Sequence, residues 1–441
     1  MNSGGALLRR SLRLTQLFTL GFGLVVGIGW MLLVGDWIMK AGPVGAVSAF
    51  VAGALLIGVI GLCYAEIASA YPEAGGEVVY AHRVFGPDAA FAVGWMLTLI
   101  YVAVSAFEAI GFAWLATIIF PPIEGPLFYR VLGEDVHGGS LAIGLIGMAM
   151  FGWINYRGAA LAARVQDILI YAKLAISAGF VAAAILRGDP DNLVPYFASP
   201  PSQPLDGFLA VFITAPFWYA GFGVIAQALG ERAEGTSLRL AGLSILIVIA
   251  ASCIFYTLVI LAVAMISPRA DLADAFLPAA AAFEMAFNSR GVRDVIIAAG
   301  MLGLLTAWNG LFFSSGRVLL ALGREKLLPR SFAQLSTHGT PGFALALITL
   351  AGALGVFAGK GVINPIVNLS GLIFACIFLV VCLAVVARRR KGEPPAPFQV
   401  PGGTFTAACA ALVALFIIII AVWEIARSSA APVAPEFVAL G

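Results

Sequence analysis

The chain contains an apolar stretch, Leu20-Gly-Phe-Gly-Leu-Val-Val-Gly-Ile-Gly-Trp30, in which four glycines crowd the middle. A second apolar stretch, Thr214-Ala-Pro-Phe-Trp-Tyr-Ala-Gly-Phe-Gly-Val224, combines Pro216 with two glycines. Proline removes a backbone hydrogen-bond donor, and glycine gives the backbone a freedom that weakens a helix. Each stretch therefore predicts a helix that is broken near its middle.

The composition indicates that these helices lie in a membrane. Of the 441 residues, 61% are hydrophobic and only 11% are charged, whereas soluble domains are roughly 45–50% apolar and about 25% charged. The net charge of +2 is too small to indicate a nucleic-acid partner. No Walker motif, metal-ligand spacing or converging catalytic pair is present, so the sequence predicts neither an enzyme nor a metal or cofactor site.

Eleven stretches are long and apolar enough to cross a bilayer, which requires about 20 residues of helix. They cover 14–38, 43–70, 88–120, 140–157, 164–187, 207–229, 238–266, 293–322, 341–358, 362–386 and 404–426. The segment 272–289 is too interrupted to span and predicts a short helix in an outer loop. The tail after Arg427 looks like the approach to a twelfth span, which we expect to be absent or truncated.

Positive charge in the loops predicts the orientation. With the N-terminus in the cytoplasm, fifteen lysines and arginines fall in inner loops and eight in outer loops. Because short cytoplasmic loops are enriched in these residues, we expect a cytoplasmic N-terminus in a multi-pass plasma-membrane protein.

The two glycine-interrupted stretches belong to the first and sixth spans. Unwound backbone persists in a bilayer only where protein buries it or where it lines a wet cavity. Free N–H groups at such a break favour a carboxylate, and free C=O groups favour a cation. A separation of five spans is typical of a five-plus-five inverted repeat. The alternative is that the glycines, such as Gly23 and Gly27, only allow close helix packing.

The stretch Tyr64-Ala-Glu-Ile-Ala-Ser-Ala-Tyr-Pro-Glu-Ala-Gly-Gly-Glu-Val-Val-Tyr80 resembles the signature of the amino acid–polyamine–organocation (APC) permeases. Phe217-Trp-Tyr-Ala-Gly-Phe222 is similar to the broken sixth helix of that family, and Gly316 to Pro329 is similar to the end of its eighth. Arg388 to Gly402 resembles the loop before its eleventh helix. The resemblance runs in order over nearly the whole chain.

The resemblance implies an all-α membrane protein with the LeuT-like fold, as a single domain over 1–441. Its first inverted repeat would cover 14–187, its second 207–386, and 404–426 would be a peripheral helix. The resemblance also implies a substrate site for amino acids or amines at the two breaks. Those site residues are Val26, Gly27, Ile28 and Gly29 on the first helix, and Phe217, Trp218, Tyr219, Ala220 and Gly221 on the sixth.

The sequence departs from the family pattern at both breaks. A hydroxyl residue is missing from Gly27-Ile-Gly29, and Gly223 stands where many members carry a glutamate. The second departure argues against a carboxylate role on the sixth helix.

Two charged residues stand out because they lie well inside the expected spans, where charge is expensive and usually functional. Lys173, on the fifth span, matches the lysine that occupies a sodium position in some members of the family. We expect it to couple transport to protons, with Ser314 or Ser315 and the carbonyls near Gly23 as partners. Snorkelling to the surface is the alternative. Glu108, on the third span, would bind an amine or a proton, or serve as a protonated structural acid.

Further residues are expected to gate the path. Trp30, with Trp218 and Tyr219, would cap the site, although aromatic residues in membranes more often pack or anchor. Glu66 and Glu77 would pair with inner arginines such as Arg317. The sequence therefore predicts a secondary active transporter of amino acids or amines that works by alternating access, is proton-coupled or an exchanger, and is sodium-independent. Its partners would be the small-molecule substrate and membrane lipid. A channel or a substrate sensor of the same fold is the alternative.

Overall fold

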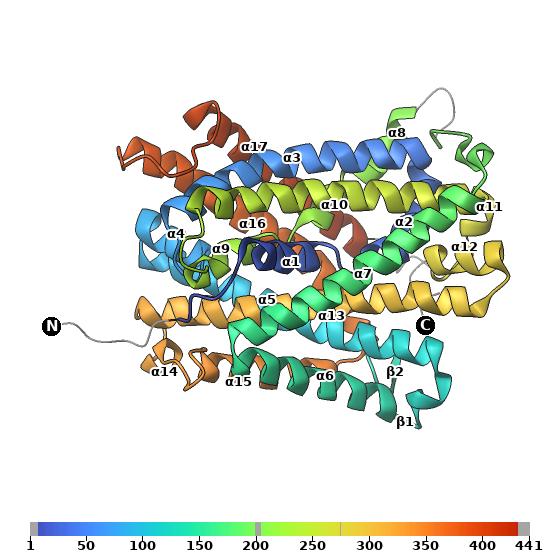
Figure 1. Cartoon of the computed structure of the whole chain (residues 1–441), viewed down its shortest axis with the longest axis horizontal. Coiled ribbons are helices and arrows are strands. Elements are labelled where there is room, and N and C mark those ends of the chain that lie inside the picture. Colours follow the sequence, from blue (N-terminus) through green and yellow to red (C-terminus); the bar gives the residue numbers. More distant parts are fainter. Residues whose placement is uncertain (1–7, 199–203, 274, 431–441) are drawn as a thin grey trace.

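Long apolar helices run side by side along one axis, and short elements cap the two ends of the bundle (Figure 1). The computed structural model describes residues 8–198, 204–273 and 275–430. Helices α4 (Glu77–Phe85) and α14 (Arg330–Ala333) lie at the end of the bundle where residues 8–13 lie, which we call the N-terminal end. Helices α11 (Arg269–Leu272) and α12 (Pro278–Phe287) lie at the other end, the hairpin end, with the two strands.

Nine helices of the described residues are long and apolar enough to cross a membrane. One is a discontinuous run, Leu205–Glu231, made of α8 (Pro204–Phe212), η3 (Ala215–Tyr219), α9 (Gly223–Ala228) and η4 (Leu229–Glu231). The others are α3 (Pro43–Ala70), α5 (Pro87–Ile119), α6 (Gly138–Arg157), α7 (Ala159–Arg187), α10 (Leu238–Ile266), α13 (Arg290–Arg324), α16 (Ile363–Arg390, in the run Lys360–Arg390) and α17 (Gly403–Ala430). The bent pair α1 (Leu14–Val25) and α2 (Gly29–Ala41) makes ten if counted as one span.

The expected count of eleven is not reached. The predicted span 341–358 forms α15 (Gly342–Val356), which is apolar but has only 15 residues, and about 20 are needed to cross the hydrocarbon core. The segment 272–289 contains the short helix α12, as the sequence predicted. The expected truncated twelfth span begins in 431–441, outside the described residues.

A β-hairpin that was not predicted from the sequence lies in the loop between α5 and α6. Strand β1 (Leu127–Val131) pairs antiparallel with β2 (Glu134–His137), next to the 3-10 turn η1 (Pro121–Glu124). The turn uses Gly133 at φ +82, a conformation that glycine adopts at no steric cost. Two further 3-10 turns, η2 (Pro190–Leu193) and η5 (Lys360–Val362), lie in other loops.

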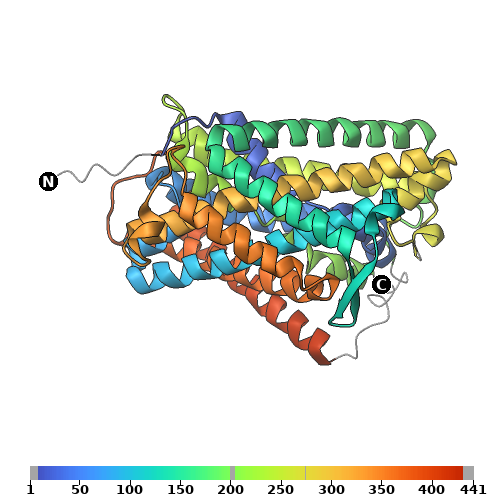
Figure 2. The same cartoon turned by 90° about the horizontal axis from the view of Figure 1, so that it is seen from below.

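Helix α13 lies in the centre of the bundle and is the most buried of the long helices, with 72% of its most apolar window inside the protein. It packs against α1, α5 and α7. By contrast, α17 lies along the outside, against α16 and α3 (Figure 2). The break between α1 and α2 therefore lies beside the most buried of the long helices, where unwound backbone can be satisfied by protein groups.

Candidate substrate site

The first broken helix ends at Val25 and resumes at Gly29 with a bend of 54°. Between them Val26 has φ −95 and ψ 81, which is outside the helical region, while its own N–H still donates to the oxygen of Phe22. The break predicted at 26–29 is therefore present over Val26–Ile28, and Gly29 already begins α2.

The carbonyl end of this break is occupied by three side chains from three helices. Thr306 Oγ1 of α13 donates to the oxygen of Gly23 at 3.2 Å. The Tyr256 hydroxyl of α10 lies 3.2 Å from the oxygen of Val25. Lys173 Nζ of α7 donates to the oxygen of Val26 at 2.6 Å. The sequence predicts the lysine at this break but carries no local signal for the threonine and the tyrosine.

Lys173 is fully buried and does not snorkel to the surface. Besides Val26, its ammonium lies 3.5 Å from Thr306 Oγ1 and 5.4 Å from the centre of the Phe22 ring. The expected serine partners are not the ones observed. Ser315 donates to the oxygen of Leu311 instead, and the Ser314 hydroxyl has no partner among the described residues.

Helix geometry explains why the serines are out of reach. They follow Thr306 by eight and nine residues on α13, which is about 12–13 Å of helical rise. The residue that meets Lys173 is therefore Thr306, more than two turns closer to the hairpin end.

The N–H end of the break is open. No hydrogen bond within the described ranges satisfies the main-chain N–H groups of Gly27, Ile28 and Gly29. A Cβ atom built on Gly27 would meet nothing within 4 Å, although the residue lies inside the bundle. A Cβ atom on Gly29 would lie 2.3 Å from the Trp218 ring, so the indole covers this residue. These N–H groups begin α2, whose dipole favours an anion at this place.

The other glycines of the first helix serve close packing. A Cβ atom on Gly21 would lie 2.7 Å from Ile225, and one on Gly23 would lie 2.1 Å from Gln166 Nε2. The packing interpretation thus holds for these two glycines and not for Gly27.

The second broken helix unwinds between Ala220 and Phe222. Ala220 is extended, with ψ 148, and Gly221 has φ +119. A Cβ atom on Gly221 would lie 3.0 Å from the carbonyl group of Leu24, so the second break lies against the last turn of α1, next to the first break. The Tyr256 hydroxyl, which contacts Val25, is also 3.1 Å from the oxygen of Trp218 and bridges the two broken helices.

The aromatic residues of this segment have different surroundings. Trp218 lies against Gly29 at the first break, and Phe217 lies against Gly371 of α16. The Tyr219 hydroxyl donates to the main-chain oxygen of Phe50 on α3, so Tyr219 joins the second broken helix to α3. Trp30 is buried and packs edge-on against Phe180 and Phe255. Its predicted gating role stays a prediction.

Glu108 of α5 has no hydrogen bond or ion pair in the part of the chain that the structure describes, although it is only 5% exposed. Lys173 is the charged group that acts on it electrostatically. The structure thus places the two intramembrane charges within each other's influence, beside the first break. A carboxylate with free oxygens can accept a hydrogen bond from an ammonium group.

Buried ion pairs lie at the N-terminal end. Arg317 Nε lies 2.6 Å from the Glu231 carboxylate. The main-chain oxygen of Glu231 accepts hydrogen bonds from the N–H groups of Ser11 and Leu12. The expected pairing of Glu66 with an arginine is confirmed for Arg389, whereas Arg317 is wrong as the expected partner of Glu66 and Glu77. The reason is that α9 and η4 carry Glu231 directly to the face of α13 on which Arg317 lies.

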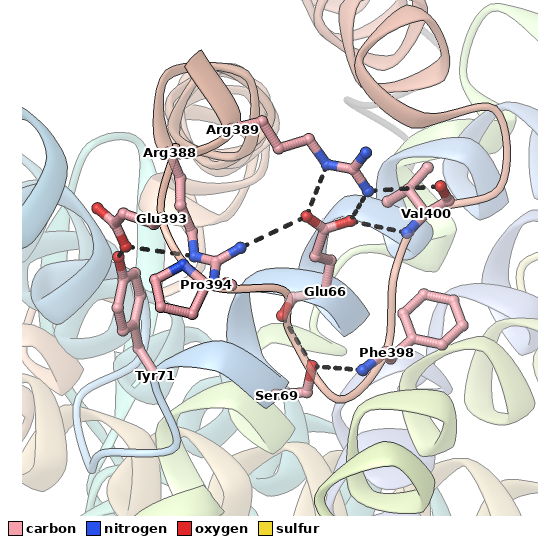
Figure 3. Close-up of polar contacts among 9 residues, drawn as sticks. All are labelled: Glu66, Ser69, Tyr71, Arg388, Arg389, Glu393, Pro394, Phe398 and Val400. Atoms are coloured by element: carbon pink, nitrogen blue, oxygen red, sulfur yellow. Dashed lines mark hydrogen bonds and ion pairs between the residues drawn. The ribbon is translucent and has the colours of Figure 1, made fainter. Parts of the chain in front are cut away.

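Glu66 does have arginine partners, but they come from the end of α16 (Figure 3). Arg389 Nε donates to Glu66 Oε1 at 2.8 Å, and Arg388 lies 3.8 Å from the same carboxylate. The Val400 N–H donates to Glu66 Oε2 at 2.7 Å, and the Phe398 N–H donates to the Ser69 hydroxyl at 3.2 Å. The loop before α17 is therefore fixed to the end of α3.

A bundle of apolar helices with two unwound segments is the architecture of a multi-pass membrane protein. The chain belongs to the Amino acid permease family, whose pattern matches residues 12–439.

Curated relatives extend over most of the chain. The branched-chain amino acid permease BcaP of Bacillus subtilis is 26% identical over 432 residues, covering 96% of this chain and 90% of the relative. The BcaP protein of Lactococcus lactis is 26% identical and covers 87% and 83%. The methylthioribose transporter of Bacillus subtilis is also 26% identical and covers 89% and 84%.

Proposed function

We propose that this protein is a sodium-independent secondary transporter that carries an amino acid across the plasma membrane by alternating access. The observation that supports it most is the contact between Lys173 Nζ and the Val26 oxygen at 2.6 Å. The Lys173 ammonium group already donates to a carbonyl oxygen at this end of the break, where a sodium ion would otherwise bind. The open N–H end is then left for the carboxylate of a substrate.

The substrate proposal follows from the groups around Gly27. Its carboxylate would accept hydrogen bonds from the N–H groups of Gly27, Ile28 and Gly29. Its ammonium would lie toward Glu108, whose Oε2 has no hydrogen-bond partner in the described residues. The Trp218 ring covers Gly29 at the edge of this space, and an aromatic neighbour favours an apolar side chain. The relatives named as branched-chain amino acid permeases support the same class.

Coupling would involve Lys173 and Glu108. Buried groups that influence each other exchange protons when their surroundings change. A proton that leaves Lys173 would weaken its bond to Val26 and free α1 to move against α7 and α13. This supports proton coupling or exchange rather than sodium coupling.

The fold proposal is the inverted repeat, with halves at 14–187 and 207–386 and a peripheral helix at 404–426. It is supported by the positions of the two breaks, which lie at Val26–Ile28 and Ala220–Phe222, with Gly221 of the second against Leu24 in the last turn of α1. A repeat of this kind places a single site between its two halves.

Reconstituted protein tests the function. The purified full chain is first screened by thermal shift against amino acids, polyamines and methylthioribose, because a ligand of the folded state raises the melting temperature. We expect leucine, isoleucine or valine to give the largest shift. Proteoliposomes loaded with the best ligand should then take up labelled ligand faster than empty ones, with equal rates in sodium and choline buffers. Uptake that is not stimulated by internal ligand would indicate a channel instead. Ligand binding without uptake would indicate a sensor.

A further inference from the structure

Glu77, the first residue of α4, is a buried carboxyl group at the N-terminal end. It is 2% exposed, and its Oε2 accepts a hydrogen bond from Gln227 Nε2 of α9 at 2.9 Å. The same amide nitrogen donates to the Tyr101 hydroxyl of α5 at 2.8 Å. A Cβ atom on Gly223, where α9 begins, would lie 2.5 Å from Glu77 Oε1. The carboxyl group therefore fills the space next to the second break.

Glu77 differs from the two other buried acids at this end. Glu66 and Glu231 are each 1% exposed, and each forms an ion pair with an arginine, Arg389 and Arg317 respectively. In the described part of the chain, Glu77 pairs with no basic residue. Burying an ionised carboxylate without a cation is unfavourable, so the neutral acid is the form that suits these surroundings.

The groups that face Glu77 from the packed helices are uncharged hydrogen-bonding groups. They are Tyr64 on α3, Tyr80 on α4 itself, Tyr101 on α5 and Gln227 on α9. Cys382 of α16 lies beyond Tyr64, and Glu73 acts on Tyr80 from the loop before α4. On α13, the guanidinium of Arg317 donates two hydrogen bonds to the Glu231 carboxylate. Burial raises the pKa of Glu77 to about 7, and the hydrogen bond from Gln227 opposes the rise.

We propose that Glu77 is a proton-binding site that holds its proton while the N-terminal end is packed and releases it when that end opens. In the packed state the carboxyl group keeps its O–H bond, because no cation is present to balance a carboxylate. When α4 separates from α9, water reaches the group, the O–H bond breaks, and the proton passes to that water. The carboxylate left behind is then solvated.

This site differs from the proposed coupling pair of Lys173 and Glu108, because it lies at the N-terminal end, against Gly223. Glu77 and α9 meet directly, so its proton is linked to the position of the second broken helix. Only the effect on uptake rests on the proposed amino acid transport. Proton binding itself can be measured without a substrate, so a failure of one proposal does not imply failure of the other.

Infrared spectroscopy of the full chain in lipid nanodiscs tests the proposal. Spectra are recorded between pH 5 and pH 9 without any amino acid, and the carbonyl band of protonated carboxyl groups is followed. We expect the wild type to show a component that disappears with a midpoint near pH 7, and Glu77→Gln to lose it. The control Glu73→Gln removes an exposed acid that pairs with Arg83, and this component should remain.

A second variant tests the same site in the other direction. Gln227→Leu removes the amide N–H that favours the carboxylate, so the midpoint should move to higher pH. This variant keeps Glu77 and remains informative if Glu77→Gln does not fold. Glu108→Gln should leave the component in place. A component that survives in Glu77→Gln, or a midpoint that stays or falls in Gln227→Leu, would overturn the proposal.

Discussion

Lys173 on α7 donates a hydrogen bond to the main-chain oxygen of Val26, at the break between α1 and α2, over 2.6 Å. The bond joins a fully buried ammonium group to a carbonyl oxygen that accepts from no main-chain N–H group in the described residues. Because Thr306 and Tyr256 hold the neighbouring carbonyls of Gly23 and Val25, the break is fixed by three helices at once. Movement of α1 must therefore break or carry along these contacts.

Lys173→Met should abolish uptake in proteoliposomes. The substitution keeps most of the side-chain volume but leaves the Val26 carbonyl without its charged donor, and an unsatisfied buried acceptor costs about 1–3 kcal/mol. The control Lys40→Met removes a half-exposed lysine that pairs with Asp36 and should transport normally. In Lys173→Ala the space left by the ammonium should admit sodium, so any residual uptake should depend on sodium. Sodium-dependent uptake by the wild type would contradict the assignment.

Gly27→Ala tests the proposed substrate space, and Gly221→Ala tests the backbone conformation at the second break. A methyl group at Gly27 meets no atom within 4 Å, so the variant should fold with an unchanged melting temperature but bind substrate at least tenfold more weakly. At Gly221, φ is +119 and the Leu24 carbonyl is 3.0 Å from the new atom, so the variant should be destabilised by about 1–3 kcal/mol. Thermal unfolding and binding titrations measure both. Equal affinity in Gly27→Ala would place the substrate elsewhere.

Tyr256→Phe removes the hydroxyl that lies between the oxygens of Val25 and Trp218. The two broken helices then lose a shared donor, and the expected loss of stability is about 1–2 kcal/mol. The maximal uptake rate should fall more than the affinity, because the two helices no longer move together. Tyr171→Phe is the matched control, since Tyr171 is exposed on α7. Wild-type stability and uptake in Tyr256→Phe would rule out this bridge.

The breaks could be predicted from sequence because glycine and proline weaken a helix wherever it lies. The glycines at 21, 23, 27 and 29 gave the position of the first break, and Lys173 stood out because charge is rare within a span. The sequence could not assign the partners of Lys173. Thr306, Ser314 and Ser315 share one helix, and only the depth at which α7 crosses α13 decides which of them meets the ammonium.

Long-range pairing of charges was equally hidden. Glu66, Glu77 and Arg317 all belong to segments expected at one end of the bundle, and any of the acids could have met the arginine. In the structure, Arg317 pairs with Glu231 and Arg389 pairs with Glu66. These partners depend on how α9 and the loop before α17 pack, which the sequence does not show. The length of α15 was overestimated because apolar residues flank the helix on both sides.

Glu108→Gln tests the partner proposed for the substrate ammonium. The amide keeps the shape of the side chain but carries no charge, so it attracts an ammonium group less strongly than a carboxylate. Binding of an amino acid should weaken at least tenfold, and uptake should lose part of its pH dependence. The control Glu284→Gln lies at the hairpin end, near Arg293. Unchanged uptake across pH in Glu108→Gln would leave this residue a structural acid.

The buried Glu77 also predicts how the stability of the protein changes with pH. Burial raises the pKa of Glu77 from 4.5 to about 7 in the folded protein, so the folded state binds this proton more tightly than the unfolded state does. The resulting stabilisation is fully present below about pH 4.5 and is lost as the pH rises through 7. A shift of this size corresponds to roughly 3 kcal/mol, at about 1.4 kcal/mol per pH unit.

Thermal unfolding of the full chain in detergent measures this dependence. The melting temperature of the wild type should fall between pH 5 and pH 8, and the fall should be smaller in Glu77→Gln, because glutamine does not titrate. The two proteins should therefore differ most above pH 7, where the wild type must bury a carboxylate without a cation and the variant does not. Glu73→Gln removes an exposed acid and should follow the wild-type curve at every pH. Parallel curves for the wild type and Glu77→Gln would show that the acid has the same proton affinity in both states.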